Sequence, residues 1–92
     1  MPKLNYPLNI YIRAVEQLVL ESNFERVRIK ETTGSIVRFE VFIPGENEPT
    51  SIWVIHYAHD RKKSVWSKED YKKPPKHLCM PETRFLEILN SL

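Results

Sequence analysis

The fold is decided by the stretch FERVRIKETTGSIVRFEVFI, Phe24–Ile43. Polar and apolar residues alternate on both sides of TTG, Thr32–Gly34, and this alternation is typical of two β-strands joined by a tight turn. Gly34, at the last position of a three-residue loop, suits the left-handed backbone conformation that such loops require. The stretch therefore predicts an antiparallel hairpin with one apolar face.

The register of this hairpin follows from the length of its loop. A three-residue loop over Thr32–Gly34 places Ile29 opposite Val37, so that apolar side chains meet on one face. The same register sets Arg28 directly opposite Arg38 on the other face. Two like charges in that arrangement indicate either side chains that splay into water or a binding site for an anion.

The two ends of the chain carry helical patterns. Apolar residues over 8–19 recur at the spacing of one helix face, with Asn5 expected to cap the helix and Asn23 to end it. Pro81 and Glu82 suit the first turn of a second helix over 80–92. The apolar stripes of these helices are Leu8, Tyr11, Ile12, Val15, Leu18 and Val19, and then Phe85, Ile88, Leu89 and Leu92. The predicted core consists of these residues except Leu92, together with five residues of the hairpin: Val27, Ile29, Val37, Phe39 and Val41.

A third strand is predicted in SIWVIHYAH, residues 51–59. Its residues 52–55 are apolar on both faces, which suits a strand with a covered outer face. We expect the strand to end near Tyr57 or Ala58, because Asp60 and the charges that follow it are poor strand formers.

The segment Asp60–His77 is predicted to be mostly loop, with a short turn near residues 67–71, because Pro74 and Pro75 interrupt it. Trp66 is expected to anchor this loop to the body of the protein, since a large aromatic side chain contributes much buried area.

The order of these elements is helix, strand, strand, strand, helix. Two amphipathic helices need one apolar surface to cover. The expected fold is therefore a single α+β domain over residues 1–92, with a three-stranded antiparallel sheet covered on one face by two helices.

Size and composition exclude several classes of protein. A chain of 92 residues suggests one small domain. It contains no apolar run long enough for a membrane helix, and its N-terminus lacks the pattern of a signal peptide. The one cysteine, Cys79, rules out an internal disulfide, so we expect a reducing cytoplasm. No motif calls for a cofactor, since two glycines cannot build a phosphate-binding loop.

Positive charge is concentrated in one segment. Asp60–His77 holds seven Lys or Arg residues and three acidic residues, a net charge of +4, whereas the remainder carries −2. Basic residues with aromatic residues between them are typical of nucleic-acid-binding surfaces, although a solvated loop has a similar composition. Together with the two hairpin arginines, the candidate nucleic-acid-binding residues are Arg28, Arg38, Arg61, Lys62, Lys63, Trp66, Lys68, Lys72 and Lys73.

Metal and nucleophile chemistry are less well supported. His56, His59, Asp60, His77 and Cys79 are possible ligand types, but they lack the spacing of the known zinc motifs. A thiol just before a helix gains reactivity from the helix dipole, yet the same place suits a small semi-buried residue. We therefore predict no metal site and no catalytic residue.

An apolar outer surface is the alternative to nucleic-acid binding. Ile36, Phe42 and one face of IWVIHY, residues 52–57, form a candidate protein-binding or homodimer patch, to which Trp53 would belong. The edge of the first or third strand offers a second route, because a partner's strand can pair with it.

The pattern LVLESNFERVRIKETTGSIVRFEVF…SIWVIH…PETRFLEIL resembles the HicA (YcfA-like) toxins of bacterial toxin–antitoxin pairs. NFERVR, residues 23–28, matches the start of that family's first strand, and TGS, residues 33–35, matches its turn; His56 lies near the end of the third strand. The resemblance implies a double-stranded-RNA-binding-domain-like α-β-β-β-α fold and action on RNA. The family's catalytic histidine follows Gly-Ser, and that position here is Ile36, so the resemblance supports the fold more than the activity.

Three hypotheses follow. The first is a small non-catalytic regulatory domain that binds nucleic acid, RNA being favoured over DNA by analogy. The second is a protein-interaction module or homodimer that acts as a regulatory partner. The third is a HicA-like ribonuclease in which His56 or His59 transfers the proton instead.

Overall fold

The computed structural model describes residues 5–32, 34–58 and 63–92. Its elements are β1 (Tyr6–Pro7), α1 (Leu8–Glu21), β2 (Arg26–Thr32), β3 (Ile36–Phe42), β4 (Ser51–His56), β5 (Ser64–Val65), α2 (Lys68–Leu78) and α3 (Glu82–Ser91). Strands β2, β3 and β4 form an antiparallel sheet in that order, and β1 pairs with β5 in a separate two-stranded sheet. The predicted α+β class with a three-stranded antiparallel sheet is confirmed.

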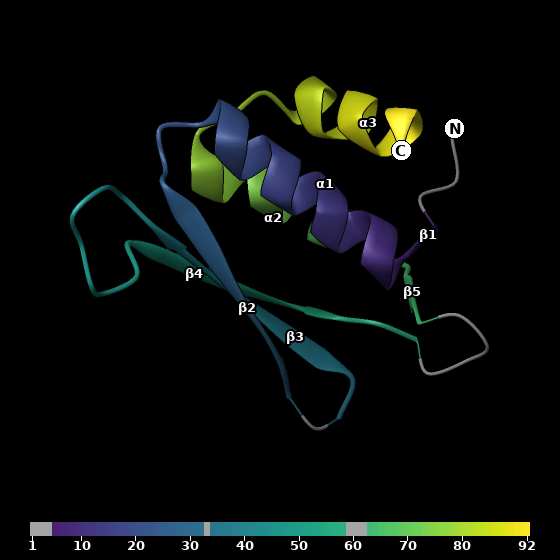
Figure 1. Cartoon of the computed structure of the whole chain (residues 1–92). Coiled ribbons are helices and arrows are strands. Elements are labelled where there is room, and N and C mark those ends of the chain that lie inside the picture. The colour runs from purple at the N-terminus through teal and green to yellow at the C-terminus, as the bar shows by residue number, and fades with distance from the viewer. Residues whose placement is uncertain (1–4, 33, 59–62) are drawn as a thin grey trace.

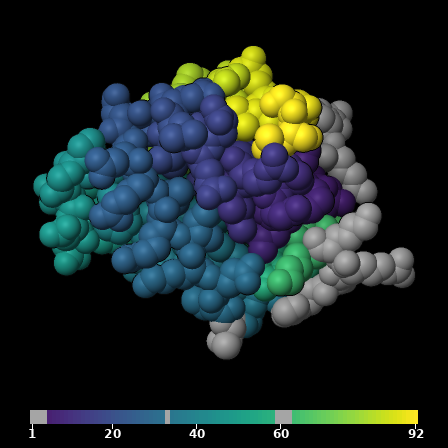
Figure 2. Space-filling view, viewed as in Figure 1, coloured from purple at the N-terminus to yellow at the C-terminus, as the bar shows by residue number. Residues whose placement is uncertain are grey.

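The helices all lie on one side of the three-stranded sheet (Figure 1). Helix α1 packs against β2 and α2 packs against β4, while α3 packs mainly against α1 and α2. In the space-filling view, α1 and the β2–β3 hairpin form one continuous surface (Figure 2). We call the covered side of the sheet the inner face and the opposite side the outer face. The strand residues of the outer face are Arg26, Arg28, Lys30, Thr32, Ile36, Arg38, Glu40, Phe42, Ile52, Val54 and His56.

The predicted hairpin register is wrong by two residues. Ile29 lies opposite Phe39 and Arg28 opposite Glu40, and the last pair before the turn is Thr32 with Ile36. A shift of two residues keeps every side chain on its expected face. The observed register brings Arg28 and Glu40 together, which replaces the repulsive pair of arginines by opposite charges.

The ends of α1 also differ from prediction. No side chain caps its start, where Pro7 precedes Leu8, so Asn5 does not cap the helix. The helix ends at Glu21 rather than at Asn23, because the hydroxyl of Ser22 donates to the carbonyl of Val19 over 2.7 Å.

The segment predicted as a loop contains α2, with Pro74 and Pro75 inside the helix. Proline in a helix interior normally costs stability, because it cannot donate a backbone hydrogen bond to the carbonyl four residues earlier. For Pro74 that carbonyl belongs to Asp70, and the hydroxyl of Tyr11 donates to it over 2.6 Å. Both prolines are buried against the core, so the helix is stabilised by tertiary contacts that the local sequence does not reveal.

The core follows the predicted faces of α1, the hairpin and α3, with three differences in degree. Ile12, Val27 and Ile29 are half-buried rather than buried. Leu92, which was not part of the predicted core, is exposed. Seven further apolar residues are buried, most of them because α2 and β4 close the core: Ala14, Phe42, Trp53, Ile55, Val65, Tyr71 and Leu78.

The expected anchor of the segment after β4 is a different residue. Strand β4 ends at His56, close to the predicted position, and an isolated bridge joins Ala58 to Ser64. Trp66 is 51% exposed, whereas its neighbour Val65 is fully buried. Val65 pairs with Tyr6 in the small sheet, so Val65 rather than Trp66 ties the backbone to the core.

In the described part of the chain, no helix combines the length and the apolar character that a membrane span requires.

Candidate nucleic-acid interface

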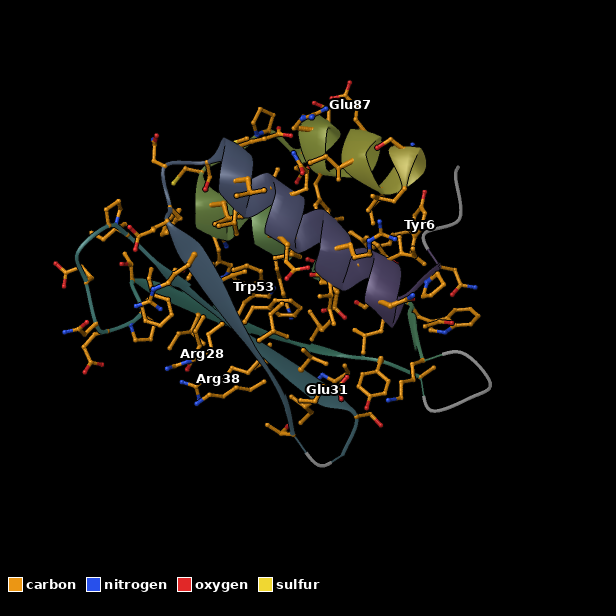
Figure 3. The ribbon with its side chains drawn as sticks, in the orientation of Figure 1. Tyr6, Arg28, Glu31, Arg38, Trp53 and Glu87 are labelled. Carbon is orange, nitrogen blue, oxygen red and sulfur yellow. The ribbon has the colours of Figure 1, made fainter. Side chains whose placement is uncertain are left out.

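The outer face of the sheet is strongly basic. Its charged strand residues are four cations, Arg26, Arg28, Lys30 and Arg38, and one carboxylate, Glu40, so their net charge is +3. The four cationic side chains are between 45% and 53% exposed. Arg28 and Arg38 point away from the helices, whereas Trp53 lies between the sheet and the helical layer (Figure 3). None of the helices in the described part of the chain covers this cationic surface, so it is accessible to a large anion.

Glu40 lies beneath this cationic surface. Only 3% of the residue is exposed, and its carboxylate accepts from Nε of Arg28 over 2.5 Å and contacts Nε of Arg38 at 3.0 Å. Nζ of Lys30 is 4.0 Å from the same carboxylate. The hydrogen bond from Arg28 holds the pKa of Glu40 below its ordinary value, so the carboxylate is ionised at neutral pH. The carboxylate of Glu40 thus lies between Arg28 and Arg38, the two arginines that the predicted register set opposite each other.

Each of these arginines contacts Glu40 through Nε, the guanidinium nitrogen nearest the backbone. The two terminal amino groups of a guanidinium lie farther along the side chain than Nε. A guanidinium oriented in this way keeps donors for a second anion, and paired donors suit the oxygens of a phosphate. Glu40 therefore orients Arg28 and Arg38 as well as balancing part of their charge.

The two aromatic members of the apolar patch expected around Ile36, Phe42 and Trp53 are buried, whereas Ile36 is half-buried. Phe42 is on the outer face but is buried, because the guanidinium of Arg26 lies 3.8 Å from the centre of its ring. Trp53 points to the inner face and is 4% exposed. The exposed aliphatic residues of this face are Ile52 and Val54 on β4, at 39% and 40%.

A cleft of about 530 Å³ lies where β4 ends and α2 begins. Its lining includes His56, Tyr57, Trp66, Glu69, Asp70 and Lys73. His56 is the last outer-face residue of β4, so the cleft borders the outer face. Burial of Val65 and the start of α2 at Lys68 fix the backbone on both sides of Trp66.

Lys73 crosses the edge of β4. Its Nζ lies 3.0 Å from Oδ1 of Asp70 and donates to the carbonyl of Val54 over 2.8 Å. A lysine bound to an edge carbonyl occupies a position that a partner's strand would need. The β4 edge is therefore less suited to strand addition than the sequence suggested.

Two of the other predicted contact residues lie next to residues that line the cleft. Lys63 lies with its Nζ 5.7 Å from the ring centre of Tyr57, and Lys72 is 3.9 Å from the carboxylate of Glu69. Lys68 is exposed at the first position of α2. Arg61 and Lys62 lie outside the described residues.

The predicted site thus separates into two groups. The structure brings Arg28 and Arg38 together on the outer face, and it brings Trp66 and Lys73 together in the cleft. The predicted set omits three residues that contact or neighbour the arginines, namely Arg26, Lys30 and Glu40. The strand alternation already places all three on the outer face, but the role of Glu40 depends on the true register.

The remaining histidines and the thiol have separate environments. Nδ1 of His77 lies 2.6 Å from Oγ of Ser51, and the ring stacks on Trp53 at a centroid distance of 5.1 Å. Burial, together with the charges of Lys76 and Lys73, lowers the pKa of His77, so its imidazole is neutral at neutral pH. Cys79 is exposed, which makes the expected semi-buried environment wrong.

Within residues 5–32, 34–58 and 63–92, no group of three or more His, Cys, Asp or Glu side chains is arranged to hold a metal ion. His59 and Asp60, two of the possible ligands considered from the sequence, lie outside these ranges.

No protein-family model, curated protein or solved structure is significantly similar to this chain. The resemblance to the HicA toxins therefore stays a prediction from short motifs.

Proposed function

We propose that this protein is a small non-catalytic domain that binds the phosphate backbone of nucleic acid with the outer face of its sheet. RNA is preferred over DNA in this proposal on the basis of the family resemblance. The observation that carries the proposal is the uncovered outer face, with four half-exposed cations and a buried carboxylate that orients two of them.

The chemistry of these side chains matches a phosphate backbone. Arginine forms strong paired hydrogen bonds with phosphate oxygens, and a guanidinium that is already oriented loses less conformational freedom on binding. Glu40 lies deeper than the cations around it, so an approaching anion meets the guanidinium groups first. An exposed sheet face is also a common platform for single-stranded RNA.

The protein-interaction alternative has weaker support. Its aromatic members, Phe42 and Trp53, are buried, and only Ile52 and Val54 present exposed aliphatic surface on this face. Charged residues are depleted at the centre of typical protein interfaces. The outer face has four cations, three of them on the edge strand β2, and this charge suits a phosphate backbone better than an apolar partner.

The test is the double variant Arg28→Ala/Arg38→Ala, titrated with short single- and double-stranded RNA and DNA at two salt concentrations. We expect weaker binding to every ligand, because phosphate contacts carry no sequence information. Each lost contact should reduce the slope of log K against log salt concentration by about 0.7 for a single strand, so the slope should fall by roughly 1 to 2.

Arg13→Ala provides the matched control, since Arg13 is an exposed arginine on α1, in the helical layer on the other side of the sheet. It removes one positive charge from the molecule without altering the outer face. Failure of the unchanged protein to bind any of these ligands at low salt would overturn the proposal, and so would equal weakening by the control and by each single arginine change.

The cleft favours a second candidate function, a ribonuclease with a displaced histidine. It places the imidazole of His56 near Lys73 and Asp70, a combination that can transfer protons. Lys73 is already bound to Asp70 and to the carbonyl of Val54, so we expect RNA incubated with the protein to stay intact. Cleavage that disappears in His56→Ala but persists in Lys76→Ala, an exposed lysine change on α2, would establish the ribonuclease instead.

A further inference from the structure

The cleft borders the outer face at the end of β4. In the β3–β4 pairing, Arg38 lies opposite Val54 and Ile36 lies opposite His56. Val54, which faces Arg38, and His56 are two residues apart on β4, a separation of about 7 Å. Because His56 lines the cleft, the wall of the cleft begins roughly 7 Å from Val54. A nucleotide whose phosphate is held at Arg38 is therefore close to the cleft.

The aromatic wall of the cleft is suited to a flat ligand. Trp66 is 51% exposed and Tyr57 is half-buried, and both line the cleft. Nucleobases stack on aromatic side chains that are presented in this way, whatever their sequence. The buried Val65 and the N-terminus of α2 hold Trp66 in place from either side, so little ordering of the backbone is needed for stacking.

The charge of the cleft differs from that of the outer face. Glu69, Asp70 and Lys73 together carry a net charge of −1, and the Lys73 ammonium is already paired with Asp70 at 3.0 Å. The side chain of Glu69 is 75% exposed. Lys72 lies 3.9 Å from the carboxylate of Glu69, which still has acceptor positions for the amino group of a base.

We infer that this cleft holds one base of a single-stranded nucleic acid whose phosphates lie on the outer face, stacked against Trp66. The carboxylate of Glu69 accepts a hydrogen bond from the exocyclic amino group of that base. Carboxylates accept from the N4 amino group of cytosine in this way, whereas uracil presents a carbonyl oxygen at the same position. The cleft thus selects cytosine over uracil, and the inference rests on the proposed function of the outer face.

The test compares oligocytidine and oligouridine RNAs of equal length at one salt concentration. We expect the unchanged protein to bind oligocytidine more tightly, and Trp66→Ala to weaken binding of both by about fivefold or more, as expected for a lost stack. Trp66→Phe, which keeps an aromatic face, should retain most of the affinity. Quenching of tryptophan fluorescence gives a second readout, because Trp53, the other tryptophan, is buried.

Glu69→Ala tests the base preference separately. It should reduce binding of oligocytidine to the level of oligouridine and leave oligouridine binding unchanged. Glu82→Ala is the matched control, because Glu82 is likewise an exposed acidic residue in the first turn of a helix, α3. Circular dichroism of each variant verifies that the helices are intact.

The results distinguish the inference from the proposed function. RNA binding that weakens in Arg28→Ala/Arg38→Ala but is unaffected by Trp66→Ala would overturn the inference and leave the outer-face proposal in place. Equal affinity for the two RNAs would overturn the role of Glu69. Absence of binding to either RNA at low salt would overturn the proposed function itself.

Discussion

Phe39→Ala is expected to lower the free energy of unfolding by about 3–5 kcal/mol, the range for removing a buried phenylalanine. Phe39 is fully buried at the centre of β3. Its ring stacks on Trp53 of β4 at a centroid distance of 5.1 Å and meets the edge of Tyr11 of α1 at 5.6 Å. One substitution therefore removes contacts among two strands and a helix. Urea-induced unfolding, followed by circular dichroism, measures the loss.

Ile52→Ala is the control for this change, because Ile52 lies in the same sheet but is 39% exposed on the outer face. We expect a much smaller loss of stability, since less apolar surface leaves a buried environment. A small domain has a total stability of about 5–15 kcal/mol, so the loss at Phe39 should be visible as a large fall in melting temperature. An unchanged melting temperature would mean that the inner and outer faces are interchanged.

The alternation in the hairpin was enough to predict the faces of β2 and β3 but not their register. Two registers that differ by two residues bury the same apolar side chains, so the pattern of burial cannot separate them. The polar pairs decide between them: the predicted register sets Arg28 against Arg38, whereas the observed one sets Arg28 against Glu40. That charge pairing was present in the sequence, and it separates two registers that the apolar matches leave equal.

Helix α2 was missed because proline is a strong local signal against a helix. Pro74 and Pro75 are tolerated because both are buried and because the hydroxyl of Tyr11 donates to the carbonyl of Asp70, 59 residues away in the sequence. Contacts at such a separation leave no trace in local patterns. The cleft was missed for the same reason, since α2 supplies Glu69, Asp70 and Lys73.

The candidate site was therefore only partly predictable. Arg28 and Arg38 were identified because the strand pattern places both on one face, and the structure brings them to a common carboxylate. Trp66 was expected to be buried because of its large aromatic side chain, but it is 51% exposed. Successive side chains at the end of β5 point to opposite sides, and Val65 rather than Trp66 occupies the buried position.

Tyr11→Phe is expected to destabilise the protein by about 1–3 kcal/mol, the cost of leaving a buried polar group without a hydrogen bond. The hydroxyl of Tyr11 donates to the carbonyl of Asp70 over 2.6 Å, in place of the backbone N–H that Pro74 lacks. Burial raises the pKa of Tyr11 well above its usual value, so the hydroxyl keeps its proton throughout the ordinary pH range. Phenylalanine preserves the ring contacts with Phe39, Tyr71 and Phe85 and removes the donor alone.

A double-mutant cycle with Pro74→Ala tests this explanation directly. Alanine restores a backbone N–H at position 74, which can donate to the carbonyl of Asp70 as in an ordinary helix. Tyr11→Phe should then cost clearly less in the Pro74→Ala protein than in the unchanged protein, because the carbonyl has a second donor. Pro74→Ala also changes the conformational freedom of the unfolded chain, but it does so equally with and without Tyr11→Phe, so this effect cancels in the cycle. Equal costs in the two backgrounds, measured by urea unfolding, would show that Tyr11 does not compensate for the proline.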